Sequence, residues 1–292
     1  MEIESHDDRP RMILLVACPD QPGIVAAVAG FVFERGGNIV HAEQHTDHHE
    51  RVFFQRVELE VDDRRTTPGA LADAFASIAR RFEMRWQLHA TDSVSRMAIL
   101  VSRQTHCLTD LLWRWQSGEL ADVAVPLVVS NHADARDMVE FIGPRFVHLP
   151  AGSGASPERD ALLRALFAEH EIDVVVLARF MQILGPELVE LYEERVINIH
   201  HSFLPAFAGA RPYHQAHQRG VKLIGATAHY ATAVLDDGPI IDQDVIRVSH
   251  RDTVVDLVRK GRDLERLVLA RAVRAHLEHR ILTFADKTVV FD

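Results

Sequence analysis

The spacing of apolar residues predicts a small βαββαβ unit at the front of the chain. Apolar runs flanked by polar turns indicate strands, and apolar residues three and four positions apart indicate helices. The first helix is expected to end at Gly36-Gly37, since glycine commonly terminates helices. This order, complete by about residue 90, is typical of a small sheet with two helices on one face. The expected elements are strand Arg11–Cys18, a helix carrying Ile24, Val28, Phe31 and Val32, strands Asn38–Gln44 and Val52–Val61, a helix carrying Leu71, Phe75, Ile78 and Phe82, and strand Met84–Leu88.

Beyond the polar linker Ala90–Ser95, strands and helices alternate, which predicts a doubly wound, mostly parallel sheet. Continuous apolar runs such as Val174–Ala178 indicate strands that are covered on both faces. We therefore expect one domain over 1–92, with its core at 12–90, and an α/β domain over 93–292. The expected elements are strands Met97–Ser102, Val123–Ser130, Phe146–Leu149, Asp173–Ala178, Val196–His200 and Lys222–Tyr230, an antiparallel partner Ile240–Val248, helices Leu108–Gln116, Ala133–Phe141, Pro157–His170, Pro186–Glu193 and Thr253–Glu278, and a closing hairpin of Ile281–Phe284 and Thr288–Phe291.

Composition indicates a folded globular protein and narrows its class. Of 292 residues, 47% are hydrophobic and 25% are charged. No apolar run is long enough to span a bilayer, and the acidic N terminus lacks the apolar segment of an export signal, so we expect a cytoplasmic protein without a membrane partner. Cys18 and Cys107 are the only cysteines, too few for a disulfide framework. The net charge of −10 would repel a phosphate backbone, so nucleic acid is not an expected partner.

Candidate chemistry begins at the end of the expected strand Val196–His200. Asn198 and His200 lie on one face of it because successive side chains of a strand alternate. An amide beside an imidazole at the carboxyl end of a parallel strand can hold a carbonyl oxygen. The alternative is a strand end whose polar residues only bind the next loop.

Attack on a carbonyl also needs a proton acceptor, and Asp236 is the candidate. Apolar neighbours such as Val234 and Leu235 are expected to raise the pKa of this carboxyl by desolvation. Thr227 and His229 share one face of the strand before it. No G-x-S-x-G motif is present, which disfavours a covalent intermediate. A turn aspartate without a catalytic role is the alternative for Asp236.

A second possible site is the tract of His41, His45, His48 and His49, which invites a metal. It lies in an expected hairpin turn near Arg51 and lacks a fixed second pair of ligands. A solvated turn is therefore the favoured interpretation, and no metal site is expected.

The turn D-Q-P-G-I, the helix after it and G-G-N-I resemble the ACT domain, a small-molecule sensing module, over about residues 12–90. The resemblance implies a ligand site between paired domains that involves Asp20, Gly23 and Asn38. It also implies an amino-acid effector, glycine or methionine, and a homo-oligomer formed through the ACT sheets. Open backbone N–H groups at a helix start suit a carboxylate. A purely structural role, as turn, cap and dimerising sheet, explains these residues equally well.

The motifs I-N-I-H-H-S-F-L-P and H-Y-x-x-x-x-L-D-x-G-P resemble the folate-dependent formyltransferase family over nearly all of residues 96–292. The resemblance implies that Asn198 and His200 polarise a formyl oxygen, that Asp236 manages the proton and that His229 shapes the pocket. The segment Leu177–Leu184 matches the one that cradles the pterin ring in this family. The residues expected to bind folate are Arg179, Phe180, Met181, Gln182, Ile183, Leu184, His229, Val234 and Leu235.

Three branches of that family compete. Glycinamide ribonucleotide transformylases hold the substrate phosphate in a glycine-rich loop, whereas the corresponding segment Val101–Cys107 has no glycine and its side chains would obstruct a phosphate. Methionyl-tRNA formyltransferases are disfavoured by the net charge of −10. The 10-formyltetrahydrofolate deformylases pair an N-terminal ACT domain with this catalytic domain, and the doubled His200-His201 fits them.

The resemblance therefore implies hydrolysis of 10-formyltetrahydrofolate to formate and tetrahydrofolate. Water is the expected acceptor, the folate is the substrate and no cofactor is expected. Formate is expected to feed purine synthesis and one-carbon balance. The alternatives are a phosphoribosylglycinamide formyltransferase and a non-catalytic folate or amino-acid sensor.

Overall fold

The structure is a computed structural model that describes residues 10–61, 67–120, 122–150, 156–205 and 212–292. The acidic N terminus and residues 206–211, which follow the I-N-I-H-H-S-F-L-P motif, lie outside this range. The chain forms two compact units: residues 1–93 with 278–282 and 289–292, and residues 94–277 with 283–288. That they are separate domains divided near residue 92 stays a prediction.

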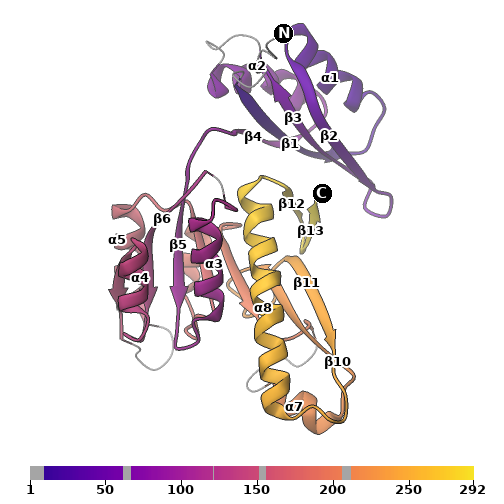
Figure 1. Cartoon of the computed structure of the whole chain (residues 1–292). Helices are drawn as coiled ribbons and strands as arrows, with labels where there is room; N and C mark the ends of the chain where they lie inside the picture. Colours follow the sequence, from indigo (N-terminus) through magenta and orange to yellow (C-terminus); the bar gives the residue numbers. More distant parts are fainter. Residues whose placement is uncertain (1–9, 62–66, 121, 151–155, 206–211) are drawn as a thin grey trace, which may run out of the picture. The chain divides into compact units, whose positions relative to one another are not determined.

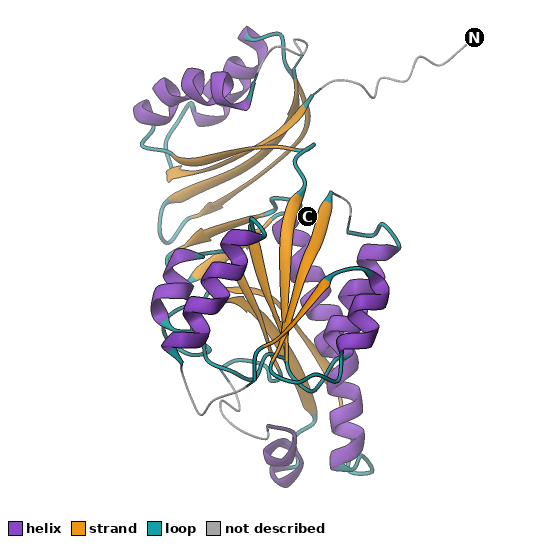
Figure 2. Ribbon diagram, turned by 90° about the vertical axis from the view of Figure 1, so that its left-hand side faces the viewer, coloured by secondary structure: helices purple, strands orange, loops and turns teal. Residues whose placement is uncertain are grey.

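The first unit contains a four-stranded antiparallel sheet of order β2-β3-β1-β4, with α1 and α2 on one face (Figure 2). The predicted βαββαβ order is confirmed. Apolar side chains from both helices meet over the sheet. The rings of Phe31 and Phe75 pack edge to face there, with 5.0 Å between their centroids. The elements are β1 (Arg11–Pro19), α1 (Ile24–Glu34), β2 (Asn38–Asp47), β3 (Val52–Glu60), α2 (Pro68–Arg81) and β4 (Arg85–Ala90).

The second unit contains a seven-stranded sheet of order β11-β10-β9-β8-β5-β6-β7, of which Figure 1 labels β5, β6, β10 and β11. Strands β5 to β9 pair in parallel, and β10 pairs antiparallel with both β9 and β11. The mostly parallel sheet is thus confirmed. The elements are β5 (Ser95–Val101), α3 (His106–Gln116), β6 (Val123–Ser130), α4 (Arg136–Ile142), β7 (Arg145–His148), α5 (Pro157–Glu169), β8 (Val174–Ala178), α6 (Pro186–Leu191), β9 (Val196–His200), α7 (Pro212–Arg219), β10 (Leu223–Tyr230), β11 (Ile240–Arg247) and α8 (Val254–Leu277), followed by the hairpin β12 (Ile281–Phe284) and β13 (Lys287–Val290).

Helices cover both faces of this sheet, as the continuous apolar strands require. Ala98 and Leu100 of β5 contribute to a core with α5 and α6, whereas α8 packs against α3 and against β9, β10 and β11. Among the described helices, none combines the length and the apolar character needed to cross a membrane.

Helix α7 is the one described helix that the apolar pattern does not predict. Its sequence P-Y-H-Q-A-H-Q-R buries only Pro212, Tyr213 and Ala216. A short helix with so few apolar positions has no detectable period, and tertiary contacts stabilise it instead.

Candidate active site

The antiparallel pairing of β9 with β10 brings the two polar segments together. Its register sets Asn198 opposite His229 and His200 opposite Thr227. The Nδ2 atom of Asn198 lies 3.1 Å from Nε2 of His229. Sequence spacing alone places Asn198 and His200 on one face of their strand, and Thr227 and His229 on one face of theirs. The pairing of the two strands makes the four residues neighbours.

His229 is held as a neutral imidazole in one orientation. It is buried, and burial lowers its pKa, because desolvation disfavours the charged form. Its Nδ1 lies 2.9 Å from the carbonyl oxygen of Tyr230 and therefore donates to it, which leaves Nε2 to accept from the Asn198 amide. His229 thus fixes the amide of Asn198 with its nitrogen toward β10.

Asp236 reaches the same place from the turn after β10. Its backbone is left-handed, with φ 57°, and the turn closes as the Tyr230 N–H donates to the Pro239 carbonyl oxygen at 2.9 Å. A Cβ at Gly238 would lie 1.7 Å from the Tyr230 carbonyl oxygen, so only glycine fits there. Oδ1 of Asp236 lies 3.2 Å from Nδ1 of His200 and 3.8 Å from Nε2 of His229. The three predicted catalytic residues therefore meet around one point.

The expected rise in the pKa of Asp236 is wrong. The hydrogen bond from His200 is the largest influence on this carboxyl and lowers its pKa, outweighing the opposing effect of burial. Two of the apolar neighbours expected to bury it, Val234 and Leu235, are themselves 62% and 67% exposed. Asp236 is therefore an ionised carboxylate at neutral pH.

His200 has one nitrogen without a partner. Nδ1 faces Asp236, whereas Nε2 is buried and has no hydrogen-bond partner among the described residues. A buried polar nitrogen left unsatisfied is costly unless a ligand or water completes it. This atom therefore marks where a polar group of a ligand would fit.

Apolar side chains stand exposed in both segments expected to bind folate. Met181 is 60% exposed and Ile183 is 51% exposed, and they resemble Val234 and Leu235 in this respect. Phe180 and Leu184, in contrast, are buried in the core beneath α5 and α6. Val234 and Leu235 directly precede Asp236 in the chain, and exposed apolar side chains next to buried polar groups are typical of a ligand site.

Known proteins show the same architecture. Residues 95–273 match the formyl transferase family, and residues 12–67 match the ACT domain. A formyltetrahydrofolate deformylase of a Synechocystis species is 54% identical over 95% of this chain and 97% of its own length. The chain belongs to the formyltetrahydrofolate deformylase family.

Solved structures agree with this membership. A formyltetrahydrofolate deformylase from Pseudomonas syringae pv. tomato superposes with a TM-score of 0.94, at 48% identity over 99% of this chain and 96% of that one. A glycinamide ribonucleotide transformylase from Symbiobacterium toebii has a TM-score of 0.64 at 30% identity and covers 69% of this chain and 95% of its own. The deformylase family accounts for both halves of the chain, and the transformylase for one.

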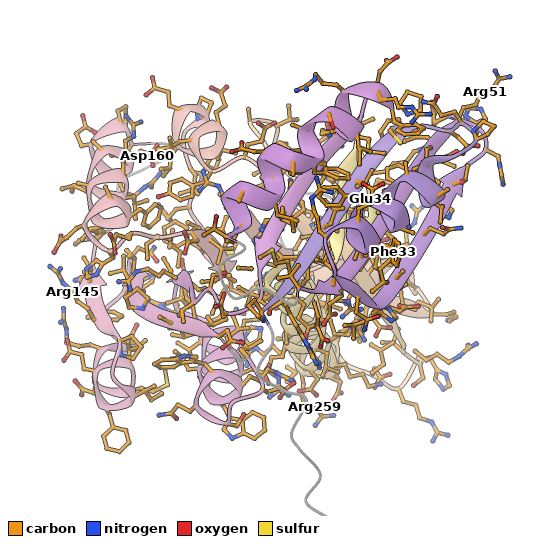
Figure 3. All side chains as sticks on the ribbon, turned by 90° about the horizontal axis from the view of Figure 1, so that it is seen from above. Phe33, Glu34, Arg51, Arg145, Asp160 and Arg259 are labelled. Carbon is orange, nitrogen blue, oxygen red and sulfur yellow. The ribbon has the colours of Figure 1, made fainter. Side chains whose placement is uncertain are left out.

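Within this deformylase-family fold, α5 secures the segment expected to cradle the pterin. Arg159 donates to the Ile183 carbonyl and, at 3.2 Å, to Oε1 of Gln182. Oδ2 of Asp160, which Figure 3 labels, accepts from the Gly185 N–H at 2.8 Å. Neither residue is predicted from the sequence. The signal that could have revealed them is a pair of adjacent charged residues at positions of α5 that face the core.

Thr227 and Gln243 secure the loop after β9 in a similar way. The buried Thr227 hydroxyl donates to the Ser202 carbonyl at 2.9 Å and accepts from the Leu204 N–H at 3.1 Å. Gln243 donates to the same hydroxyl at 2.9 Å and to the Leu204 carbonyl at 3.1 Å. Gln243 was not predicted, because nothing in the sequence of β11 links it to this loop.

Two of the residues expected to bind folate use their side chains elsewhere. Arg179 is buried, with its Nε 3.4 Å from Glu265 and its Nη2 3.4 Å from Oε1 of Gln104. The Gln182 amide donates to its neighbour's carbonyl. Any contact of Arg179 with a ligand would therefore use its backbone.

The three residues expected at the ACT ligand site do not meet within one chain. Asn38 lies opposite Glu60, which pairs with Arg11 at the start of β1, whereas Asp20 follows the end of β1. Asn38 and Asp20 are thus at opposite ends of the sheet, roughly 30 Å apart at the rise of a strand. Gly23, with φ 95°, precedes α1 at the same end as Asp20.

The histidine tract forms no cluster of three metal ligands within the described residues. His41 and His45 are in β2, His48 and His49 are in the turn after it, and Arg51 projects from that turn in Figure 3. The one group of three that the described chain brings together is His106, Cys107 and Glu265.

Proposed function

We propose that this protein hydrolyses 10-formyltetrahydrofolate to tetrahydrofolate and formate. The observation that carries the proposal is the meeting of Asn198, His200 and Asp236: the carboxylate contacts Nδ1 of His200 and lies near His229, to which the Asn198 amide is bound, while Nε2 of His200 is buried and unsatisfied. The exposed apolar side chains of Met181, Ile183, Val234 and Leu235 would cover the folate ring system.

The reaction needs a water molecule, an oxyanion site and a proton path. The Asp236 carboxylate accepts a proton as the oxygen of water bonds to the formyl carbon. Asn198 donates through its remaining amide hydrogen to the formyl oxygen, and Nε2 of His200 is the second donor to that oxygen. The C–N10 bond then breaks as the proton passes to N10, which releases formate.

The test is formate release by the purified protein with 10-formyltetrahydrofolate and no added amine. Stoichiometric formate and tetrahydrofolate are expected. Activity that requires glycinamide ribonucleotide would instead make the protein a transformylase, and folate binding without turnover would make it a sensor.

The remaining functional assignments follow from this activity. Formate would supply purine synthesis and balance the one-carbon pool, in the cytoplasm. The ACT unit would bind glycine or methionine between two copies of the chain, with Asp20 and Gly23 from one copy and Asn38 from its partner, because the two ends of a single sheet are too far apart.

Isothermal titration with glycine and with methionine tests the effector proposal. Binding should weaken at least tenfold in Asn38→Ala, and sedimentation should show an oligomer. Unchanged binding in this variant would remove Asn38 from the site.

A further inference from the structure

The centre of the seven-stranded sheet is the natural place for a second ligand. The chain passes from β5 to β6 on one side and returns to β8 on the other, so the strand order reverses between β5 and β8. Sheets of this kind hold ligands outside the carboxyl ends of the strands at such a point, and anions at the start of the following helix. Here α3 begins there with His106, and Arg179 follows β8.

A carboxylate of the protein itself occupies this position. Glu265 of α8 is 1% exposed, and both of its oxygens have partners. Oε2 lies 2.7 Å from Nε2 of His106 and 3.4 Å from Nε of Arg179, and Oε1 accepts from the Tyr213 hydroxyl at 2.6 Å. The first turn of α3, the segment after β8 and α7 therefore converge on one charge from α8.

The helix that carries this carboxylate is shaped for the arrangement. Gly261 lies one turn before Glu265, and a Cβ there would lie 2.0 Å from the Tyr213 hydroxyl oxygen. A glycine inside a helix is unfavourable, so its presence in the middle of α8 needs a packing reason, and the approach of Tyr213 supplies one.

A metal ion does not explain the cluster. His106, Cys107 and Glu265 offer three ligand atoms within 4.8 Å of one another, but a guanidinium nitrogen of Arg179 lies 3.4 Å from the same carboxylate. Burial raises the pKa of the Cys107 thiol well above its ordinary value, whereas a metal binds the thiolate. Burial by itself would raise the pKa of Glu265, yet His106 and Arg179 together lower it, so the carboxylate is ionised without a metal.

We propose that Glu265 is a built-in anion that closes the crevice between β5 and β8 to phosphorylated co-substrates, so that water alone reaches the formyl group. The inference rests on the proposed hydrolysis. Arg179 and His106, the groups that would attract a phosphate, are both engaged by Glu265, and the loop before α3 presents Gln104 to Arg179 instead of open backbone. Glu265 thus determines specificity through the side chains that it holds, His106 and Arg179.

The deciding experiment is phosphate binding by Glu265→Gln, which keeps the size of the side chain and removes its charge. Inorganic phosphate should raise the Tm of this variant saturably, by about 3 °C or more at concentrations well above Kd, relative to chloride at equal ionic strength. The wild type should show no such rise. Asp263→Asn is the matched control, because it removes one exposed negative charge from the same helix. An unaffected Glu265→Gln, or an equal response of Asp263→Asn, would overturn the proposal.

His106→Ala provides a second test that does not depend on Glu265→Gln folding. It opens space beside the carboxylate and retains the charge, so phosphate should still not bind. Phosphate binding by His106→Ala would show that bulk and not charge closes the crevice. Formate release by the wild type is measured separately, so its absence would refute the hydrolysis, whereas the phosphate titrations contain no folate and report on the crevice alone.

Discussion

Two polar clusters at the seven-stranded sheet differ in whether the protein satisfies the side chain at their centre. Between β9 and the turn after β10, Nε2 of His200 is buried without a partner among the described residues, and apolar side chains such as Leu235 stand exposed beside it. Between β5 and β8, both oxygens of the buried Glu265 are bound by the protein. A buried imidazole nitrogen without a partner, next to exposed apolar side chains, can take a ligand, whereas a carboxylate that the protein binds on both oxygens occupies the place of one.

The largest effect should come from Asp236→Asn. Loss of the proton acceptor should lower kcat by about 10²–10⁴-fold, while folate binding persists because the exposed apolar side chains are untouched. The measurement is formate release together with folate titration. Asp237→Asn is the matched control, since it changes an exposed aspartate in the same turn. Normal turnover by Asp236→Asn would assign the proton to another group.

A double-mutant cycle on Asn198 and His229 tests how these two residues of the candidate active site depend on each other. Asn198→Ala should lower kcat by about 10²–10³-fold because it removes an oxyanion donor. His229→Ala should cost about tenfold, since it only releases the Asn198 amide from its orientation. In the double variant the loss should equal that of Asn198→Ala alone. Fully additive losses would mean that His229 has a role of its own in the reaction.

Stability at acidic pH tests His201, which follows His200 in the loop after β9. Burial and the neighbouring Arg179 lower the pKa of His201 to about 4, whereas the unfolded chain takes up this proton near the ordinary value of 6.5. Stability should therefore fall as the pH decreases from 6.5 toward 4, by up to about 1.4 kcal/mol per pH unit.

His201→Gln should remove that dependence. Between pH 7 and pH 5, the free energy of unfolding measured in urea should fall by about 1–2 kcal/mol less in the variant than in the wild type. Asp236 does not interfere with this measurement. Because its pKa in the folded protein is lowered, its contribution to stability is lost only when the pH falls below its ordinary pKa of 3.8. Identical pH profiles of wild type and variant would show that His201 is not buried as a neutral group.

The smallest effect on activity is expected at the exposed apolar residues next to Asp236. Leu235→Ser should raise KM for the folate about three- to tenfold with kcat little changed, because about 1 kcal/mol of apolar contact is lost on binding. Its free energy of unfolding should change by less than about 0.5 kcal/mol, since the side chain is exposed. Phe141→Ser, at the 92% exposed Phe141 on α4, is the control and should leave KM unchanged.

Local pattern was sufficient for most of the fold. The strand Val196–His200 was predicted to the residue, because its apolar run is bounded by polar segments. The expected β2 strand ended at Gln44, whereas the structure continues it to Asp47, since pairing with β3 orders polar residues that have no apolar period. For the same reason α7 went unpredicted, and its Tyr213 is recognisable only from its contact with α8.

That Asn198, His200 and Asp236 stand at the ends of elements can be predicted from local sequence, because strand periodicity and the D-D-G-P turn are local properties. Three features become visible only once the chain is folded: His200 lowers the pKa of Asp236, Arg179 turns toward Glu265, and Asn38 lies far from Asp20. Each of these depends on side chains or strands brought together from distant parts of the chain. Strand register and helix packing set such distances, and the charges and hydrogen bonds found there set the ionisation of the groups.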